Sequence, residues 1–339
     1  TGLVSTGAAT VWNFDGSGFV GGTYTDTGTN DTVNFAIGSA GTTVSVKPGT
    51  IWNNLGFTGS GRTATLTESI NVAGNVTLGN DVIVALGENS IVMTGASKVL
   101  SLADEATINN TGTNGSVQFT GNAQIITVTG APNTAPTLTN IVVNNDGGTE
   151  LLIDEPINIA GTLAMLDGGV EIDGSTGANA GVIAVTFTGT SAGISRTFPK
   201  EGIDLVGSNT IVGTYDLTGS GTAGTFGSEY SATLVRNLTI SATGAVTTAN
   251  TVASISGNLL VSHATGIFTT AANLTVAGNV TATGDIAIGA GTLAFSGVLN
   301  TANNATGGTI SGATLQFSGA NQTHTHAGHI SAISKFSAT

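Results

Sequence analysis

The side chains of this sequence that could do chemistry are a few carboxylates, and most of them follow glycine-rich turns. Oxygen ligands in such turns suit calcium, which takes about six to eight of them. Neither NNDGGTE nor LDGGVEID matches an EF-hand or the nonapeptide calcium repeat. Calcium binding is therefore one interpretation, and ordinary turn chemistry, in which short polar side chains bond to nearby backbone, is the other. The candidate calcium ligands are Asp146, Glu150, Asp167, Glu171 and Asp173.

Three histidines stand close together near the end of the sequence, in the stretch NQTHTHAGH. His324 and His326 are two residues apart, so on a strand their imidazoles would share a face, and His329 could complete a divalent metal site. The stretch contains no acidic residue that could orient the imidazoles. A polar terminal strand is therefore the simpler interpretation.

Paired carboxylates also raise the alternative of a polysaccharide-cleaving enzyme, because general acid and base catalysis needs two such groups on one face. Glu171 and Asp173 would share a strand face, and Asp154 adjoins Glu155. No acidic residue recurs at one position of the repeat described below, and solvated turns account for both pairs. The sequence therefore predicts a protein without catalytic residues, and without a cofactor other than the calcium considered above.

Composition restricts the partners and the location of the chain. With seven Lys and Arg and a net charge of -13, no basic patch can neutralise phosphates, which argues against nucleic acid. The sequence contains no run of about 18 apolar residues, so it predicts no membrane-spanning helix. The chain has no cysteine, which fits an exported protein as well as a cytosolic one. It begins without a signal-peptide pattern, so in a secreted protein, which the resemblance described below implies, Thr1 would be the start left after signal-peptide removal.

A repeated strand-like phrase indicates the elements that position these residues. It reads INVAGNVTLG at 70–79, INIAGTLAMLDG at 157–168 and LTVAGNVTATG at 274–284. Thr50 and Thr137 lie 87 residues apart, and Gly74 and Gly161 are separated by the same 87 residues. Matched offsets at both ends of the phrase indicate true repeats.

A shorter period lies inside the last repeat. Gly257, Gly278 and Gly297 follow one another after 21 and 19 residues, and apolar residues alternate with polar ones between them. The sequence therefore predicts an all-β fold, a parallel β-solenoid of roughly 20-residue coils in three tandem units. Phe295 and Phe317 would then occupy the same place in neighbouring coils. An array of β-sandwich domains is the alternative.

The repeats divide the chain into five segments. They are 1–49, an N-terminal β segment and candidate assembly strand; 50–136, repeat unit 1; 137–232, repeat unit 2 with a loop insertion near 190–232; 233–322, repeat unit 3; and 323–339, a C-terminal strand and candidate assembly tail.

The phrases LTNIVVNNDGG, INIAGTLAMLDGG, LVRNLTIS and ISGNLLV resemble the strand repeats of large bacterial cell-surface and secreted β-solenoid proteins, of the adhesin and autotransporter-passenger type. The resemblance covers about residues 50–325. It implies a β-solenoid in an extracellular or cell-surface setting, and it does not imply a ligand.

An isolated solenoid exposes strand edges that soluble solenoids normally cover with a cap. Both ends of this sequence are apolar and β-prone, without a charged, helical or proline-rich cap. We therefore expect a non-catalytic structural subunit whose partner is a second copy, assembling head to tail by β-strand addition into a filament, sheath or related layer. The expected assembly residues are Leu3, Val4, Val11, Trp12, Phe14, Ile330, Ile333 and Phe336.

The alternative function is an adhesin that binds a surface glycan through a lateral face of the solenoid. Glycan binding favours exposed aromatic side chains, and this chain has two Trp and three Tyr. We expect Trp12 and Trp52 to fill the first coils rather than to form such a platform.

Overall fold

A computed structural model describes most of the chain between residues 51 and 301, together with parts of either end. The described residues are 3–5, 11–15, 24–26, 31–37, 42–44, 51–110, 112–130, 133–145, 149–175, 181–231, 233–248, 253–270, 273–301, 308–312, 314–318, 325–326, 330–331 and 335–338. The backbone alone is described at 3–5, 11–15, 24–26, 42–44, 253, 325–326, 330–331 and 335–338. This part of the chain contains β-strands and no helix.

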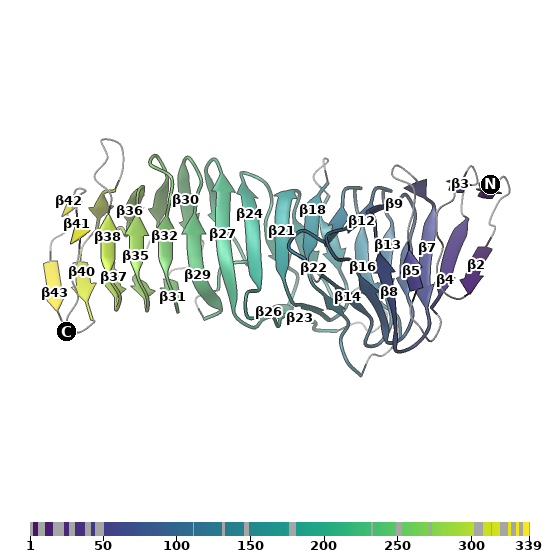
Figure 1. Ribbon diagram of the computed structural model, residues 1–339. Helices are drawn as coiled ribbons and strands as arrows, with labels where there is room; N and C mark the ends of the chain where they lie inside the picture. The colour runs from purple at the N-terminus through teal and green to yellow at the C-terminus, as the bar shows by residue number, and fades with distance from the viewer. Residues whose placement is uncertain are drawn as a thin grey trace. The chain divides into compact units, whose positions relative to one another are not determined.

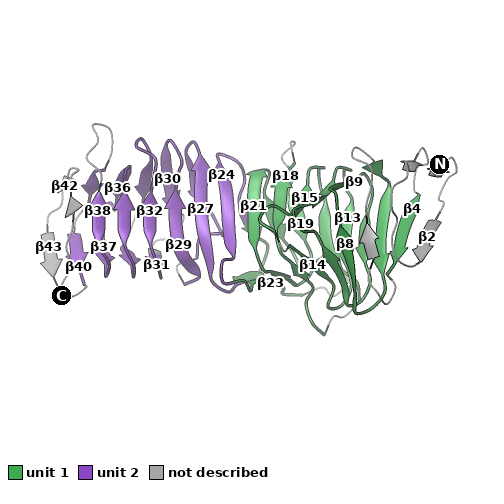
Figure 2. Cartoon of the chain, viewed as in Figure 1, with its two compact units in different colours: residues 1–189, 204–211 green, residues 190–203, 212–339 purple. Residues whose placement is uncertain are grey.

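The chain divides into two compact units, coloured green and purple in Figure 2. The first contains residues 1–189 and 204–211, and the second contains 190–203 and 212–339. Within each unit the strands of successive coils pair in parallel, as Figure 1 shows. The described residues form about 11 coils, about 22 residues apart, so the predicted β-solenoid is confirmed and the β-sandwich alternative is wrong.

The first compact unit contains three parallel sheets, named here A, B and C, and most of its coils contribute a strand to each. Sheet A contains, in spatial order, β2 (Val11–Asp15), β4 (Thr32–Ala36), β7 (Asn54–Thr58), β10 (Val76–Leu78), β13 (Val99–Leu102), β16 (Ile125–Val128), β19 (Leu151–Ile153), β22 (Val170–Ile172) and β25 (Ile203–Leu205). Sheet B contains β5 (Thr42–Val44), β8 (Arg62–Leu66), β11 (Val82–Ala85), β14 (Thr107–Asn109), β17 (Thr137–Leu138), β20 (Ile157–Ile159), β23 (Ala184–Phe187) and β26 (Thr210–Val212). Sheet C contains β6 (Ile51–Trp52), β9 (Ile70–Val72), β12 (Ser90–Met93), β15 (Ser116–Phe119), β18 (Ile141–Asn144) and β21 (Thr162–Asp167). A separate two-stranded sheet pairs β1 (Leu3–Ser5) with β3 (Tyr24–Asp26).

The second compact unit also has three parallel sheets, named D, E and F. Sheet D contains β24 (Gly193–Phe198), β27 (Tyr215–Gly221), β29 (Val235–Ile240), β32 (Leu259–Val261), β35 (Val280–Ala282), β38 (Leu299–Thr301) and β41 (Thr325–His326). Sheet E contains β28 (Gly224–Phe226), β30 (Ala245–Thr248), β33 (Ile267–Thr269), β36 (Asp285–Ala287), β39 (Ile310–Ser311) and β42 (Ile330–Ser331). Sheet F contains β31 (Ala253–Ile255), β34 (Leu274–Val276), β37 (Thr292–Phe295), β40 (Thr314–Phe317) and β43 (Lys335–Ala338).

The core of each unit is a stack of apolar side chains, because alternate residues of a strand point to opposite faces. In the first unit Phe35 pairs with Phe57 in the next coil, and their rings stack with centroids 5.7 Å apart. Trp52 is 1% exposed and its ring lies 6.1 Å from that of Phe35, so it fills the core as expected. The side chain of Trp12 lies outside the described residues.

The predicted pairing of Phe295 with Phe317 is confirmed in the second unit. The two residues are register partners in β37 and β40, and their rings meet edge to face with centroids 5.0 Å apart. Edge-to-face contact is a favoured geometry for aromatic pairs. The coil period read from the sequence therefore matches the structural register at this point.

The recurring Gly-Asn of the repeated phrase has a steric and hydrogen-bonding reason. Gly278 donates its backbone N–H to the carbonyl of Gly257 at 2.7 Å, and Asn279 donates its own to Oδ1 of Asn258 at 2.8 Å. A Cβ on Gly278 would lie 2.6 Å from that carbonyl and 2.5 Å from that Oδ1, closer than real Cβ contacts. Each coil thus needs glycine where it crosses the asparagine of the preceding coil.

One segment of the predicted domain organisation contains strands. The stretch 190–232, where the sequence led us to expect a loop insertion, contains strands β24 to β28. Arg196 lies within β24, and only residues 199–202 form the turn before β25. Thr is common in strands, so a stretch rich in Thr can form strands as well as a loop. The boundaries of the three repeat units come from sequence similarity alone, so they stay a prediction.

Candidate functional site

The outer face of sheet A carries a hollow whose floor is a glycine. The pairing of β4, β7 and β10 aligns Asn34 with Gly56 and Thr77 in successive coils. A Cβ on Gly56 would lie 2.9 Å from Oδ1 of Asn34. Because position 56 is glycine, the side chain of Asn34 can lie across the strand at this point.

A groove of about 430 Å³ lies over this hollow. That volume is within the range of roughly 300–1,000 Å³ that is typical of ligand sites. The lining is mostly hydroxyl and carboxamide groups, with one cation. The lining residues are Thr32, Asn34, Asn54, Leu55, Gly56, Thr58, Asn75, Thr77 and Lys98.

Hydrogen bonds between coils fix the orientation of two carboxamides in the groove. Oδ1 of Asn54 accepts the backbone N–H of Asn75 at 2.9 Å, and Oδ1 of Asn75 accepts that of Val99 at 3.0 Å. Among the described residues the Nδ2 group of Asn75 has no partner, and Lys98 forms no ion pair. The groove therefore presents free donors, an ammonium and an amide NH₂, beside the threonine hydroxyls.

Later coils place carboxylates on the same outer face of sheet A. Asp154 and Asp173 directly follow Ile153 and Ile172, which are register partners in β19 and β22. Asp154 is 8% exposed, and no described residue bonds to its Oδ1. Burial raises the pKa of Asp154 above its usual range, and the hydrogen bond from Thr127 only partly opposes this.

The charge environment of the two aspartates differs. The nearby carboxylates of Glu155 and Asp173 add to the upward shift in the pKa of Asp154. Asp173 accepts two hydrogen bonds from Ser175, from the hydroxyl and the backbone N–H, both at 2.9 Å, and these lower its pKa. Asp173 therefore stays ionised, while Asp154 is held in an environment that favours its neutral form.

The predicted calcium ligands are not gathered into one cluster in the described part of the chain. Asp167 ends β21 in sheet C, whereas Glu171 lies within β22 in sheet A and Asp173 follows it. No group of three or more His, Asp or Glu side chains among the described residues is arranged to hold a metal ion. Glu150 precedes β19, and Asp146 lies outside the described residues, so calcium binding stays a prediction.

The predicted histidine site cannot be placed. Only the backbone of His326 is described, within β41, and His324 and His329 lie outside the described residues.

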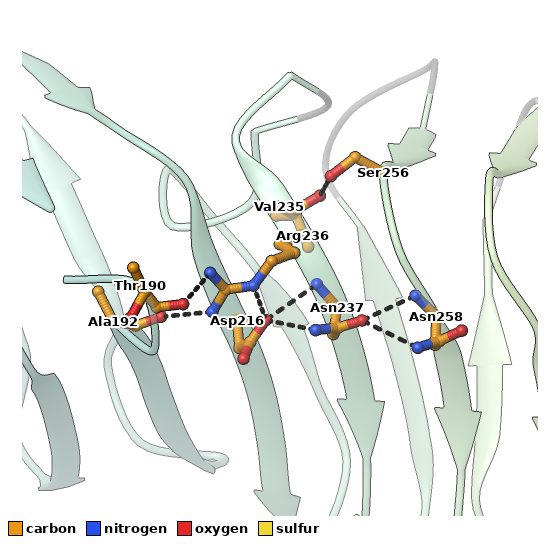
Figure 3. A network of polar contacts seen from close by, with 8 residues as sticks. All are labelled: Thr190, Ala192, Asp216, Val235, Arg236, Asn237, Ser256 and Asn258. Carbon is orange, nitrogen blue, oxygen red and sulfur yellow. Dashed lines mark hydrogen bonds and ion pairs between the residues drawn. The ribbon is translucent and has the colours of Figure 1, made fainter. Parts of the chain in front are cut away.

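A polar network on sheet D begins a ladder of side-chain hydrogen bonds (Figure 3). Oδ1 of Asp216 accepts from Nε of Arg236 at 2.8 Å and from Nδ2 of Asn237 at 2.7 Å. Oδ1 of Asn237 in turn accepts the backbone N–H of Asn258 at 2.8 Å. Burial opposes ionisation, but the bonds from Arg236 and Asn237 outweigh it and hold the pKa of Asp216 below its usual range.

This ladder continues through Asn279, whose Oδ1 accepts the backbone N–H of Val298 at 2.8 Å. The Oδ1 atoms of Asp216, Asn237, Asn258 and Asn279 each accept a hydrogen bond from the following coil. The network therefore joins successive coils, and we interpret it as structural.

A second charged group is buried in the turn region of the second compact unit. The guanidinium of Arg196 bonds to the carboxylate of Glu229, which is 0% exposed, and to the carbonyls of Lys200 at 2.7 Å and Thr225 at 2.8 Å. It also lies 4.8 Å from the ring centroid of Phe198. Each of its three nitrogens donates at least one hydrogen bond within the fold, which supports a structural role for this pair.

Sequence reasoning missed both the groove and the buried Arg196–Glu229 pair. Arg196 and Glu229 are 33 residues apart, and Lys98 is far in sequence from Thr32 on the opposite side of the groove. The one usable signal was Lys98 itself, because lysine is scarce in this chain.

Comparison of the chain with models of known protein families, with curated proteins and with solved structures finds no match in any of the three. The fold itself places the chain among repeat proteins built as a β-solenoid. The part of the chain that the structure describes contains no helix with the length and apolar character of a membrane span.

Proposed function

We propose that this chain is a non-catalytic structural subunit that assembles end to end by β-strand addition, in an extracellular filament, sheath or related layer. The observation that carries the proposal is the set of outermost strands of the second compact unit. In the described sheets β41, β42 and β43 come last in order, and each pairs on one side, with β38, β39 and β40. A parallel edge of this kind presents backbone donors and acceptors to which a further coil can add.

The strands predicted for assembly lie at the outer coils in the described part of the chain. Leu315 pairs with Phe336, and Ile310 pairs with Ile330. Leu3 and Val4 belong to β1, and Val11, Trp12 and Phe14 belong to β2, which pairs with β4. Ile333 lies outside the described residues.

The polar groups described above support a structural role over a catalytic one. The asparagine ladder and the Arg196–Glu229 pair use their hydrogen bonds to join coils. An exported setting draws its support from the likeness of the repeated phrases to bacterial surface solenoids.

Electron microscopy of the purified chain tests the proposal. We expect filaments from the intact chain, and single subunits from two shortened chains, one lacking residues 1–14 and one lacking 323–339. Each shortened chain keeps one of the two joining ends, so an equimolar mixture should form pairs and nothing longer. Circular dichroism and thermal unfolding of the shortened chains provide the control for folding. Dispersed single subunits from the intact chain at all concentrations would contradict the proposal.

A further inference from the structure

We propose that the groove on the outer face of sheet A binds a carboxylated oligosaccharide, with Lys98 receiving a sugar carboxylate and the threonine and asparagine groups receiving sugar hydroxyls. This inference stands apart from the assembly proposal, because it concerns a lateral face of the first compact unit and does not depend on any strand edge.

The donors of the groove determine the charge of the ligand. The ammonium of Lys98 has three donors and forms no ion pair among the described residues, and the Nδ2 group of Asn75 adds two donors. Hydrogen bonds from a charged donor to a carboxylate are stronger than those between neutral groups. A ligand with a carboxylate therefore gains more from this groove than a neutral one.

The overall negative charge of the chain does not prevent this binding. The adjacent acidic residue, Asp31, is 0% exposed and holds interactions within the fold. Carboxylates elsewhere on the surface act through solvent, where salt at physiological strength screens charges beyond about 8 Å. Lys98 is the one cation among the residues that line the groove.

The remaining lining favours a sugar chain over a peptide. Thr32, Thr58 and Thr77 come from three successive strands and stand at different register positions, since Thr32 pairs with Asn54, Thr77 with Gly56 and Thr58 with Ala36. Hydroxyl and amide groups are thus spread along and across the face, which suits the many hydroxyls of an oligosaccharide. Peptides that add a strand need a free sheet edge, and helical peptides need an apolar groove, whereas this groove has a polar lining on the face of a sheet.

None of the residues that line the groove is aromatic. The one large apolar side chain among them, that of Leu55, is only 1% exposed. Stacking of a ring on a sugar face is therefore missing, and we expect weak binding that depends on the charge of Lys98.

Isothermal titration calorimetry with a galacturonic acid tetramer, a neutral glucose tetramer and an aspartate tetramer tests the inference. The galacturonate should bind at least about tenfold more tightly than either of the other two. Lys98→Gln should weaken that binding about tenfold, which is the loss of one charge-assisted hydrogen bond. Arg62→Gln is the matched control, because it removes an exposed cation of the same unit outside the groove and should leave the affinity unchanged.

A second variant tests the position of the site without touching the core. Thr77 is exposed in the groove, so the ring of Thr77→Phe should fill the groove and abolish binding. Thr65 is exposed on sheet B, outside the groove, so Thr65→Phe should leave binding unchanged. Absence of galacturonate binding, equal binding by the Lys98→Gln variant, or equal binding of the aspartate tetramer would overturn the inference. None of these outcomes bears on filament formation, so the two proposals fail independently.

Discussion

Replacement of Gly74 by alanine tests the steric account of the repeated Gly-Asn phrase. A Cβ at this position would lie 1.7 Å from the carbonyl oxygen of Asn53 and 2.4 Å from Oδ1 of Asn54. The first of these atoms is backbone and cannot rotate away, so the coil must shift. The shift also displaces the hydrogen bond from the N–H of Asn75 to Oδ1 of Asn54, now 2.9 Å long.

The expected loss of stability has two contributions, the steric overlap of the added Cβ and the displaced hydrogen bond. Overpacking of a closely packed site costs about 1–3 kcal/mol. A lost hydrogen bond adds about 1 kcal/mol. We therefore expect Gly74→Ala to lower the free energy of unfolding by about 2–4 kcal/mol.

Gly79→Ala is the matched control, because it is the same chemical change five residues later in the same unit. The nearest atom to its added Cβ is the carbonyl oxygen of Phe57 at 3.4 Å, an ordinary contact. Neither glycine has a positive φ, so backbone strain does not separate the two variants. Alanine at position 79 should be neutral or stabilise by up to about 1 kcal/mol, since it restricts the unfolded chain.

Urea unfolding followed by tryptophan fluorescence measures both variants. Both tryptophans, Trp12 and Trp52, belong to the first compact unit, so the signal reports on the unit that carries the substitutions. Equal changes in the free energy of unfolding for Gly74→Ala and Gly79→Ala would refute the steric account.

Two further predictions concern buried charge. Arg196→Met leaves the carboxylate of Glu229 buried without its cation, so the free energy of unfolding should fall by about 3–5 kcal/mol. The double variant with Glu229→Leu should cost less than that single change, and an equal or larger loss in urea unfolding would contradict this. Asp154→Asn should stabilise the protein at pH 7, because burial and the charges of Glu155 and Asp173 raise the pKa of Asp154, so its ionised form costs stability above that pKa. The gain should vanish below the unfolded-state value of 3.8, where both states are protonated, and the same gain at about pH 3 as at pH 7 would count against it.

The coil glycines and the stacked phenylalanines could be predicted from the sequence. Three coil glycines are joined by backbone hydrogen bonds. The nitrogen of Gly278 lies 2.7 Å from the carbonyl oxygen of Gly257, and that of Gly297 lies 2.9 Å from the carbonyl oxygen of Gly278. Phe295 and Phe317 pair as predicted. These positions could be predicted because each residue contacts the equivalent residue of the neighbouring coil, so the same residue type recurs along the chain.

The groove could not be predicted in the same way. Its residues come from three strands and from the turn before β13, and Lys98 has no counterpart in the other coils of the lining. A site made of unlike residues from neighbouring coils leaves no period in the sequence. The buried pair of Arg196 and Glu229 escaped prediction for the same reason.

The sequence by itself determined the all-β class, the coil length and the corners where glycine and asparagine recur. These features follow from contacts between equivalent residues, and such contacts repeat with the chain. Only the tertiary structure decided that most coils have three strands, that strands β24 to β28 lie within 190–232, and which outward side chains share one face. Those outcomes depend on how many residues each turn contains, because the turns set the register that aligns Gly56 with Asn34 and Asp154 with Asp173.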